Sequence, residues 1–258
     1  MVSIIIPVLH FSRPRNLQFF YKKKYTILDV LQDIKKKVSI EHETIIVCNT
    51  GFDEKVIKLL QGHEAVNKFC INSTNVGVSR GWNIGACMAE GNMLCFLNDD
   101  MELMEGDMEK LCDVLTAEDF IGEVGPKGEK WYITETGERV KERVGLEIPE
   151  EADAIAGHFF LIKKSVFDMV GGFNTAYTPA GYEEIDMSFR IRAKGFKCLA
   201  VPNIKAKHHG VHGVSSYRHK IEYLNKSIYT DELAERNKKI FISEWYPQFF
   251  DSIYGGKS

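Results

Sequence analysis

The chain has 258 residues, 44% of them hydrophobic, which suffices for a full core and argues against a disordered protein. Its 33 basic and 36 acidic residues give a net charge of -3, which argues against a globally basic, nucleic-acid-binding surface. Six scattered cysteines without a CxxC pair are typical of a reducing compartment, and no apolar run has the length of a membrane span, so we expect a cytoplasmic protein.

The first predicted strand covers residues 2–8, because β-branched side chains fill it and Pro7 near its end cannot donate to a sheet ladder. A loop, residues 10–15, follows this strand. Thr26 and Asp29 predict a capping box, and the apolar spacing behind them predicts a helix that closes on three lysines. The chain therefore opens with a strand, a loop and a helix.

The same unit then recurs. A second strand, residues 44–48, ends at Asn49 and precedes a short helix. A third strand, around residues 65–71, leads to a glycine-opened segment and a helix that ends near Gly91. Alternating strands and helices predict right-handed crossovers and a largely parallel sheet.

The stretch of residues 94–103 joins an apolar run to acidic residues. Continuous hydrophobicity predicts a strand buried on both faces, and Asn98, Asp99 and Asp100 follow at its carboxyl end. Ligands of open α/β sheets bind at that end of the strands, so these oxygens suit a divalent cation that is bound to substrate phosphates. Asn and Asp also favour plain turns, which is the alternative interpretation.

The regular alternation stops after a further helix and a strand near residues 121–124. Residues 131–149 predict an antiparallel excursion, with a hairpin turn at Thr136 and Gly137. Residues 154–162 are apolar and return to the core. We therefore expect a mixed sheet, as in many larger α/β enzymes.

A second acidic cluster opens a predicted helix near Tyr182. Glu183, Glu184 and Asp186 fall in its first turn, where the helix dipole stabilises carboxylates, but three of them exceed what capping requires. A last strand, residues 197–201, precedes a group of histidines. The aromatic and charged tail after this group predicts a helical appendage that packs on the core or on a partner.

Taken together and in order, these segments resemble family 2 glycosyltransferases, the inverting GT-A class. The resemblance covers about 215 residues and rests on SIIIPV, IIVCNTG, NVGVSRGWNIGACMAEGNMLCFLNDD, GHFFLIKKSVFDMVGGFNTAY with GYEEIDMSFRIRAKG, and VPNIKAKHHG. It implies an α/β GT-A (nucleotide-diphospho-sugar transferase) fold, with a mainly parallel central sheet flanked by helices and a small antiparallel excursion. It also implies a catalytic domain over residues 1–215, split into a nucleotide-sugar-binding half, 1–103, and an acceptor half, 104–215, followed by a C-terminal helical extension, 216–258.

The resemblance assigns catalytic and metal-binding residues. Glu184 takes the position of the family's catalytic base, and Asp186 is the alternative. Asp100 is the expected direct ligand of Mn²⁺ or Mg²⁺, together with His208, or with His209 or His212 if the register shifts.

The resemblance also implies a set of substrate-binding residues. The family usually has an Asp where this chain has Cys48, so Asn49 is the expected reader of the base. The full set is Pro7, His10, Arg13, Asn49, Asn75, Gly77, Arg80, Asn83, Asn98, Asp99, Gly157 and Glu183.

The implied activity is metal-dependent, inverting transfer of a sugar from a UDP- or dTDP-sugar to a hydroxyl of a glycan, a lipid-linked acceptor or a protein, in bacterial surface glycan or glycoconjugate synthesis. A sugar-phosphate nucleotidyltransferase is one alternative, although it would need a glycine- and arginine-rich loop after the first strand. A nucleotide-sugar-binding protein without catalysis is the other. No nucleic acid partner is expected, while peripheral membrane association and a homo-oligomer formed through the C-terminal tail stay open.

Overall fold

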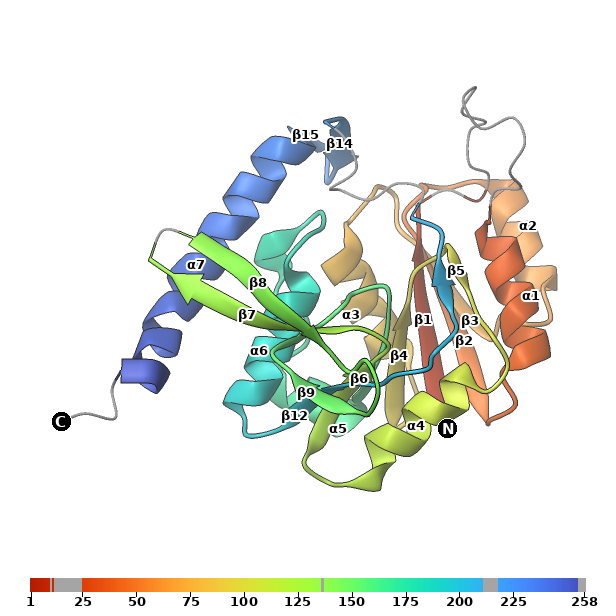
Figure 1. Ribbon diagram of the computed structural model, residues 1–258. Coiled ribbons are helices and arrows are strands. Elements are labelled where there is room, and N and C mark those ends of the chain that lie inside the picture. Colours follow the sequence, from red (N-terminus) through yellow and green to blue (C-terminus); the bar gives the residue numbers. More distant parts are fainter. Residues whose placement is uncertain (10, 12–24, 136, 211–217, 255–258) are drawn as a thin grey trace.

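The computed structural model describes residues 1–9, 11, 25–135, 137–210 and 218–254. Its centre is a sheet of eight strands (Figure 1). These are β1 (Val2–Val8), β2 (His42–Cys48), β3 (Lys68–Ile71), β4 (Met93–Leu97), β6 (Ile121–Gly125), β9 (Glu150–Ala152), β11 (Phe159–Lys163) and β12 (Lys197–Ala200). Their order is β3-β2-β1-β4-β11-β6-β12-β9.

The sheet is mainly parallel, as predicted. β1 pairs in parallel with β2 and β4, β2 with β3, and β6 with β12. β11 runs antiparallel between β4 and β6, and β9 is an antiparallel edge strand. The carboxyl ends of β1, β2 and β4 therefore meet at one edge of the sheet, where ligands of such folds bind.

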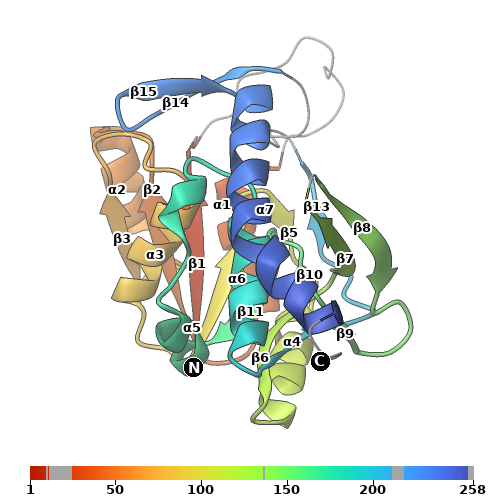
Figure 2. The ribbon, with the colours of Figure 1, turned by 90° about the vertical axis from the view of Figure 1, so that its left-hand side faces the viewer.

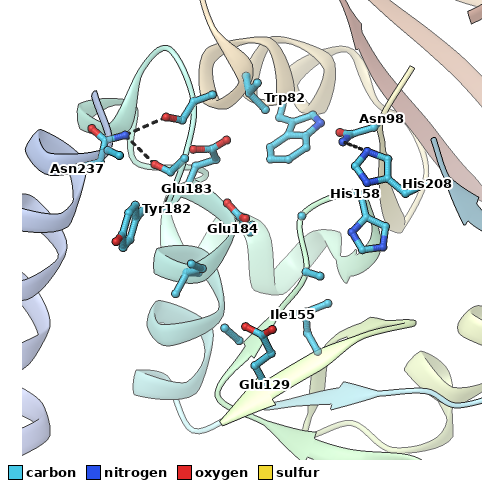
Figure 3. A pocket seen from close by; sticks show the side chains of 18 of the residues that line it. Trp82, Asn98, Glu129, Ile155, His158, Tyr182, Glu183, Glu184, His208 and Asn237 are labelled. Carbon is cyan, nitrogen blue, oxygen red and sulfur yellow. Dashed lines mark hydrogen bonds between the residues drawn. The ribbon is translucent and has the colours of Figure 1, made fainter. Parts of the chain in front are cut away.

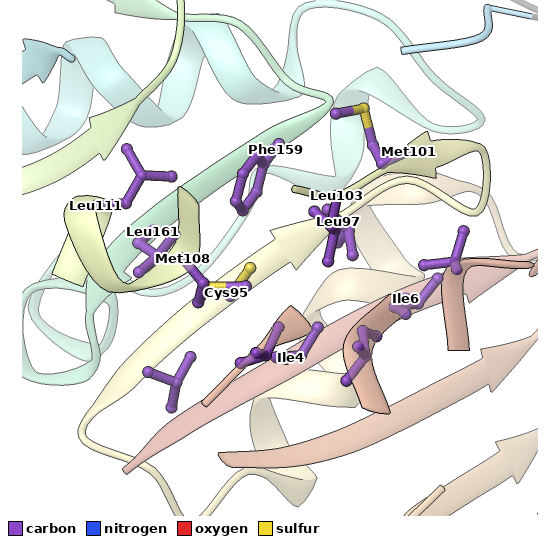
Figure 4. Close-up of a cluster of buried hydrophobic side chains, with 14 of the residues drawn as sticks. Ile4, Ile6, Cys95, Leu97, Met101, Leu103, Met108, Leu111, Phe159 and Leu161 are labelled. Atoms are coloured by element: carbon purple, nitrogen blue, oxygen red, sulfur yellow. The ribbon is translucent and has the colours of Figure 1, made fainter. Parts of the chain in front are cut away.

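Helices cover both faces of the sheet. α1 (Ile27–Lys37), α2 (Glu54–Gly62) and α4 (Asp107–Ala117) pack on one face, while α3 (Val78–Met88), α5 (Lys164–Val170) and α6 (Glu183–Ala193) pack on the other. Because successive side chains of a strand point to opposite faces, Ile4 and Ile6 enter the first core and Ile5 enters the second. Figure 4 shows the first core, where Ile4 and Ile6 lie near Cys95 and Leu97 of β4.

The predicted antiparallel excursion is confirmed as a hairpin of β7 (Gly128–Thr134) and β8 (Gly137–Val144). The predicted return of residues 154–162 to the core is confirmed, and it takes the form of two strands in different sheets. β10 (Ala154–Ile155) pairs with β7, whereas β11 pairs with β4. Residues 156–158 between them turn toward the candidate site.

The C-terminal tail contains a hairpin before its helix. β14 (Lys220–Tyr223) and β15 (Lys226–Tyr229) are joined by Leu224 and Asn225, both with positive φ, which closes a tight turn. α7 (Thr230–Tyr254) follows and packs through Phe241 and Trp245 on a third core with β7, α6 and the 3-10 helix η2 (Thr175–Tyr177). Figure 2 shows the hairpin at one end of the molecule and α7 running down from it.

Two short strands, β5 (Met101–Glu102) and β13 (Lys207–His208), form an antiparallel pair beside the central sheet. Among the helices that the structure describes, none combines the length and the apolar character needed to cross a membrane.

Candidate functional site

A cavity of about 600 Å³ opens beyond the end of β4. Its walls come from α3, the β10–β11 connection, the start of α6, β7 and α7 (Figure 3). Five residues predicted for the site line it, namely Asn98, Gly157, Glu183, Glu184 and His208. The cavity thus joins the segment after β4 to the acidic start of α6, which are far apart in sequence.

Asp100 and His208 meet at one end of the site. Pairing of β5 with β13 brings them together, and His208 Nε2 lies 3.2 Å from Asp100 Oδ1. Asn98 Nδ2 lies 3.4 Å from the same ring nitrogen. A carboxylate oxygen and an imidazole nitrogen at this distance from each other form a donor set that suits Mn²⁺.

His158 was not predicted from the sequence, yet it stands at the same end. Its ring stacks on that of His208, with centroids 5.0 Å apart and planes 7° from parallel. Burial lowers the pKa of His158 to about 4, so the ring is neutral near pH 7. The available signal was a polar histidine beside a glycine within the otherwise apolar stretch AIAGHFFLI.

The alternative histidines differ in what the structure says of them. His209 Nε2 lies 2.8 Å from Glu102 Oε2, and its ring stacks on Tyr25. Its imidazole is thus engaged away from the Asp100 carboxylate, although its backbone N–H donates to the Asp100 carbonyl. His212, like His10 and Arg13 of the predicted donor site, lies outside the described residues.

Glu183 and Glu184 form the acidic wall of the cavity. Burial raises the pKa of both carboxyls, and the nearby Glu184 raises that of Glu183 further. Glu183 is 4% exposed, and its Oε2 has no hydrogen-bond partner among the described residues. A Cβ on Gly157 would stand 2.7 Å from Glu184 Cγ, so a glycine there leaves room for the Glu184 side chain.

Asp186 faces away from this wall. It is fully buried and accepts hydrogen bonds from Arg190 Nε at 2.8 Å, Trp245 Nε1 at 3.0 Å and the Tyr177 hydroxyl at 3.4 Å. It does not line the cavity. Of the two carboxylates predicted as base, Glu184 alone can meet a bound acceptor in this geometry.

The segment before α3 is held by the β14–β15 hairpin, called the tail hairpin below. The Asn75 amide donates to the Glu222 carbonyl at 2.9 Å, and the Leu224 N–H donates to the Asn75 carbonyl at 2.9 Å. Gly77 has φ +85°, and its N–H donates to Asn75 Oδ1. Arg80, predicted as a phosphate contact, is exposed on α3 and does not line the cavity.

Asn83 does not face the predicted donor site. Its Nδ2 donates to the Phe173 carbonyl at 2.9 Å, and its Oδ1 accepts from the Phe173 N–H at 2.8 Å. Both ends of the amide therefore tie α3 to the backbone ahead of η2. This correction was out of reach of the sequence, because the partner lies 90 positions along the chain.

The remaining predicted donor residues lie near the carboxyl edge of the sheet. Asn49 is 6% exposed, accepts from Asn72 Nδ2 at 2.9 Å and donates to the Gly77 carbonyl at 3.3 Å. Pro7 is half-buried at the end of β1, and Asp99 is half-buried beside Asp100.

Comparison with known proteins gives a consistent assignment. The model of glycosyl transferase family 2 matches residues 19–171, and a model described as the N-terminal domain of galactosyltransferase matches residues 141–220. The chain is 27% identical to an uncharacterized glycosyltransferase of Haemophilus influenzae over 68% of its own length. It is 25% identical to polypeptide N-acetylgalactosaminyltransferase 11 of Xenopus tropicalis over 65% of its length. It spans only 57% and 32% of these two relatives.

Solved structures share the fold at low identity. GalNAc-T7 with UDP, GalNAc and Mn²⁺ matches with a TM-score of 0.63 and 17% identity, covering 80% of this chain and 43% of that one. The mannosyltransferase PcManGT from Pyrobaculum calidifontis, in complex with GDP-Man and Mn²⁺, matches with a TM-score of 0.55 and 14% identity over 78% and 55% of the two chains. Since the fold is of the GT-A type and the family match takes in more than half of the residues, the chain belongs to glycosyl transferase family 2.

Proposed function

We propose that the chain transfers a sugar, with inversion and with the help of a divalent metal ion, from a nucleoside-diphosphate-sugar to a hydroxyl group. One observation carries this proposal: a single cavity extends from His208, whose ring contacts Asp100, to the carboxylates of Glu183 and Glu184. The catalytic domain of the proposal comprises residues 1–215, and the tail adds a wall to its cavity.

Asp100 and His208 would hold the ion, Mn²⁺ or Mg²⁺. Their oxygen and nitrogen donors fit it, and further ligands would come from the donor's phosphates, because no group of three His, Cys, Asp or Glu gathers at this pair or at any other place among the described residues. When bound, the ion offsets the negative charge that develops on the leaving diphosphate.

Glu184 acts as general base. As the acceptor oxygen bonds to the anomeric carbon, the bond from that carbon to the diphosphate oxygen breaks, and the hydroxyl proton passes to the Glu184 carboxylate. Burial, which raises the pKa of Glu184, makes its carboxylate a stronger base than an exposed one.

The cavity wall supports an uncharged acceptor. Glu129, Glu183 and Glu184 line it, and no lysine or arginine does among the described residues. A phosphate or carboxylate on the acceptor would meet repulsion there, whereas a glycan or side-chain hydroxyl would not.

We assign UDP or dTDP to the donor and a cytoplasmic role in bacterial surface glycan synthesis to the protein.

A screen of nucleotide-sugars tests the proposal. With Mn²⁺ present, one donor should raise the midpoint temperature of thermal unfolding, because a bound ligand stabilises the folded state according to its affinity. Release of the nucleoside diphosphate with neutral acceptors, and the anomeric configuration of the product by NMR, then report transfer and inversion. Release of pyrophosphate from a nucleoside triphosphate and a sugar phosphate would instead favour a nucleotidyltransferase.

A further inference from the structure

Residues 177–181, here called the loop, run from the last residue of η2 toward α6, and Tyr182 alone separates them from Glu183. Two side chains of α7 bind this loop through its backbone. Asn237 Nδ2 lies 3.0, 2.9 and 2.8 Å from the carbonyl oxygens of residues 177, 180 and 181. Figure 3 shows two of these hydrogen bonds as dashed lines. Arg236 Nη2 donates to the Thr178 carbonyl at 2.5 Å. Four of the five carbonyls in the loop are thus held by neighbouring residues of one helix.

The fifth carbonyl faces the donor side. The Val78 N–H, at the start of α3, donates to the Pro179 carbonyl at 2.8 Å. The hydroxyls of Ser79 and Thr178 lie 3.2 Å apart, and a Cβ on Gly77 would come within 2.7 Å of the Pro179 oxygen. The loop is therefore clamped between α7 and α3, which belongs to the predicted nucleotide-sugar-binding half, residues 1–103.

Arg236 and Asn237 are themselves fixed. Asn237 is fully buried, and its Oδ1 accepts from Arg236 Nε at 3.0 Å and from Nη2 at 2.8 Å. Arg236 Nη1 donates to the Tyr223 hydroxyl of the tail hairpin, whose neighbouring residues hold Asn75. The tail therefore contacts both Asn75, through the backbone of residues 222 and 224, and the loop of residues 177–181, through Arg236 and Asn237.

We infer that Arg236 and Asn237 are positioning residues for the transfer reaction, acting through residues 177–181 on Glu183 and Glu184. The inference rests on the proposed function, in which Glu184 is the base. Neither matching family model extends to residue 236, so this role belongs to the tail that follows the matched segments. A displacement of about 1 Å in a reacting group can lower the rate about 100-fold.

Four substitutions test the inference. Arg236→Met and Asn237→Leu keep side-chain bulk but remove the donors to the loop. Lys239→Met is the matched control, since Lys239 is exposed on the same helix and pairs with Glu235 one turn away. We expect kcat for transfer to fall about 100-fold in the first two variants, with the Kd for UDP and Mn²⁺ unchanged and the control like wild type. Arg236→Lys, which retains one donor for Thr178, should recover part of kcat.

Two results would overturn the inference alone: wild-type kcat in both variants, or a loss of UDP affinity as large as the loss of kcat, which would indicate a general structural effect. If Asn237→Leu does not fold, as judged by near-UV circular dichroism, Arg236→Met and Arg236→Lys decide. A wild-type protein that transfers no sugar would instead contradict the proposed function.

Discussion

Glu184 and Asp186 lie two positions apart in one helix, but their surroundings differ in kind. Asp186 has three hydrogen-bond donors and no access to the cavity, whereas Glu184 faces the cavity and carries a raised pKa. A carboxylate with its lone pairs committed to Arg190 and Trp245 is a poor proton acceptor for substrate. The surroundings thus separate the proposed base, Glu184, from a carboxylate with a structural role, Asp186.

The raised pKa of Glu184 predicts the pH dependence of activity. The carboxylate accepts a proton only when ionised, so kcat/KM should rise with pH through a midpoint above the ordinary glutamate value of about 4.3. Conversely, the folded state holds this proton to higher pH than the unfolded chain, so this group's contribution to stability declines as pH rises through the same window. If kcat/KM instead rises with a midpoint at or below about pH 4.3, the ordinary glutamate pKa, the assignment is contradicted.

Gly157 leaves room for Glu184, and a methyl group there should displace it. We expect Gly157→Ala to lower kcat about 10- to 100-fold while UDP affinity stays unchanged, because the misplaced group is on the acceptor side. Gly62→Ala is the control, since no atom lies within 4 Å of its Cβ position. Steady-state kinetics and calorimetry measure the two quantities. If Gly157→Ala and Gly62→Ala have the same kcat, a side chain at residue 157 does not displace Glu184, and the prediction is contradicted.

At the scale of elements, the features that depend on neighbouring residues were predicted correctly. The capping box of Thr26 and Asp29 is present at the start of α1, and the apolar run of β4 is a buried central strand paired with β1 and β11. Such features depend on neighbouring residues, so the sequence predicts them.

Features that depend on contacts between residues far apart in sequence could not be predicted. His158 gains its place by stacking on His208, 50 positions later, and Asn83 is diverted by Phe173. The division of residues 154–162 into two strands depends on β7, which belongs to another sheet. The sequence therefore predicted which segments carry the site, but not which side chains within them face the cavity.

α7 contributes to stability through Trp245. Trp245→Phe removes the indole N–H that donates to the buried Asp186 carboxylate, and leaving that charge short of a partner should cost about 1–3 kcal/mol of unfolding free energy. Ser243→Ala, exposed on the same helix, should change it by less than about 0.5 kcal/mol. Urea unfolding compares the two. Identical midpoints would show that α7 does not support the acidic motif.

At the scale of the whole molecule, the sheet and its helices gather the site at one edge. Parallel strands deliver Asn49 and Asn98 there, β13 delivers His208, and the start of α6 delivers the acidic wall. α7 adds Ala234 and Asn237 to the cavity wall. The site is therefore a product of the complete fold, including its last helix.

Metal binding should stabilise the folded chain through Asp100. With UDP present, Mn²⁺ at about 100 times its Kd should add about 2.7 kcal/mol of stability to wild type, and Asp100→Ala should lose this increment. Asp119→Ala, an exposed acidic residue in a turn, should keep it. Thermal unfolding with and without the ion measures the difference. If Asp100→Ala keeps the stability added by Mn²⁺, the ion binds at a site that does not include Asp100.

The most direct test of the account compares Glu184→Gln with Asp186→Asn once a donor is known. Glu184→Gln should lower transfer about 100- to 10,000-fold while the Kd for UDP and Mn²⁺ and the unfolding midpoint stay close to wild type or improve. Asp186→Asn should lower the unfolding midpoint, because it removes the buried carboxylate that is the counter-ion of the half-buried Arg190. Retained transfer in Glu184→Gln, together with an inactive but fully stable Asp186→Asn, would contradict the assignment of Glu184 as the base.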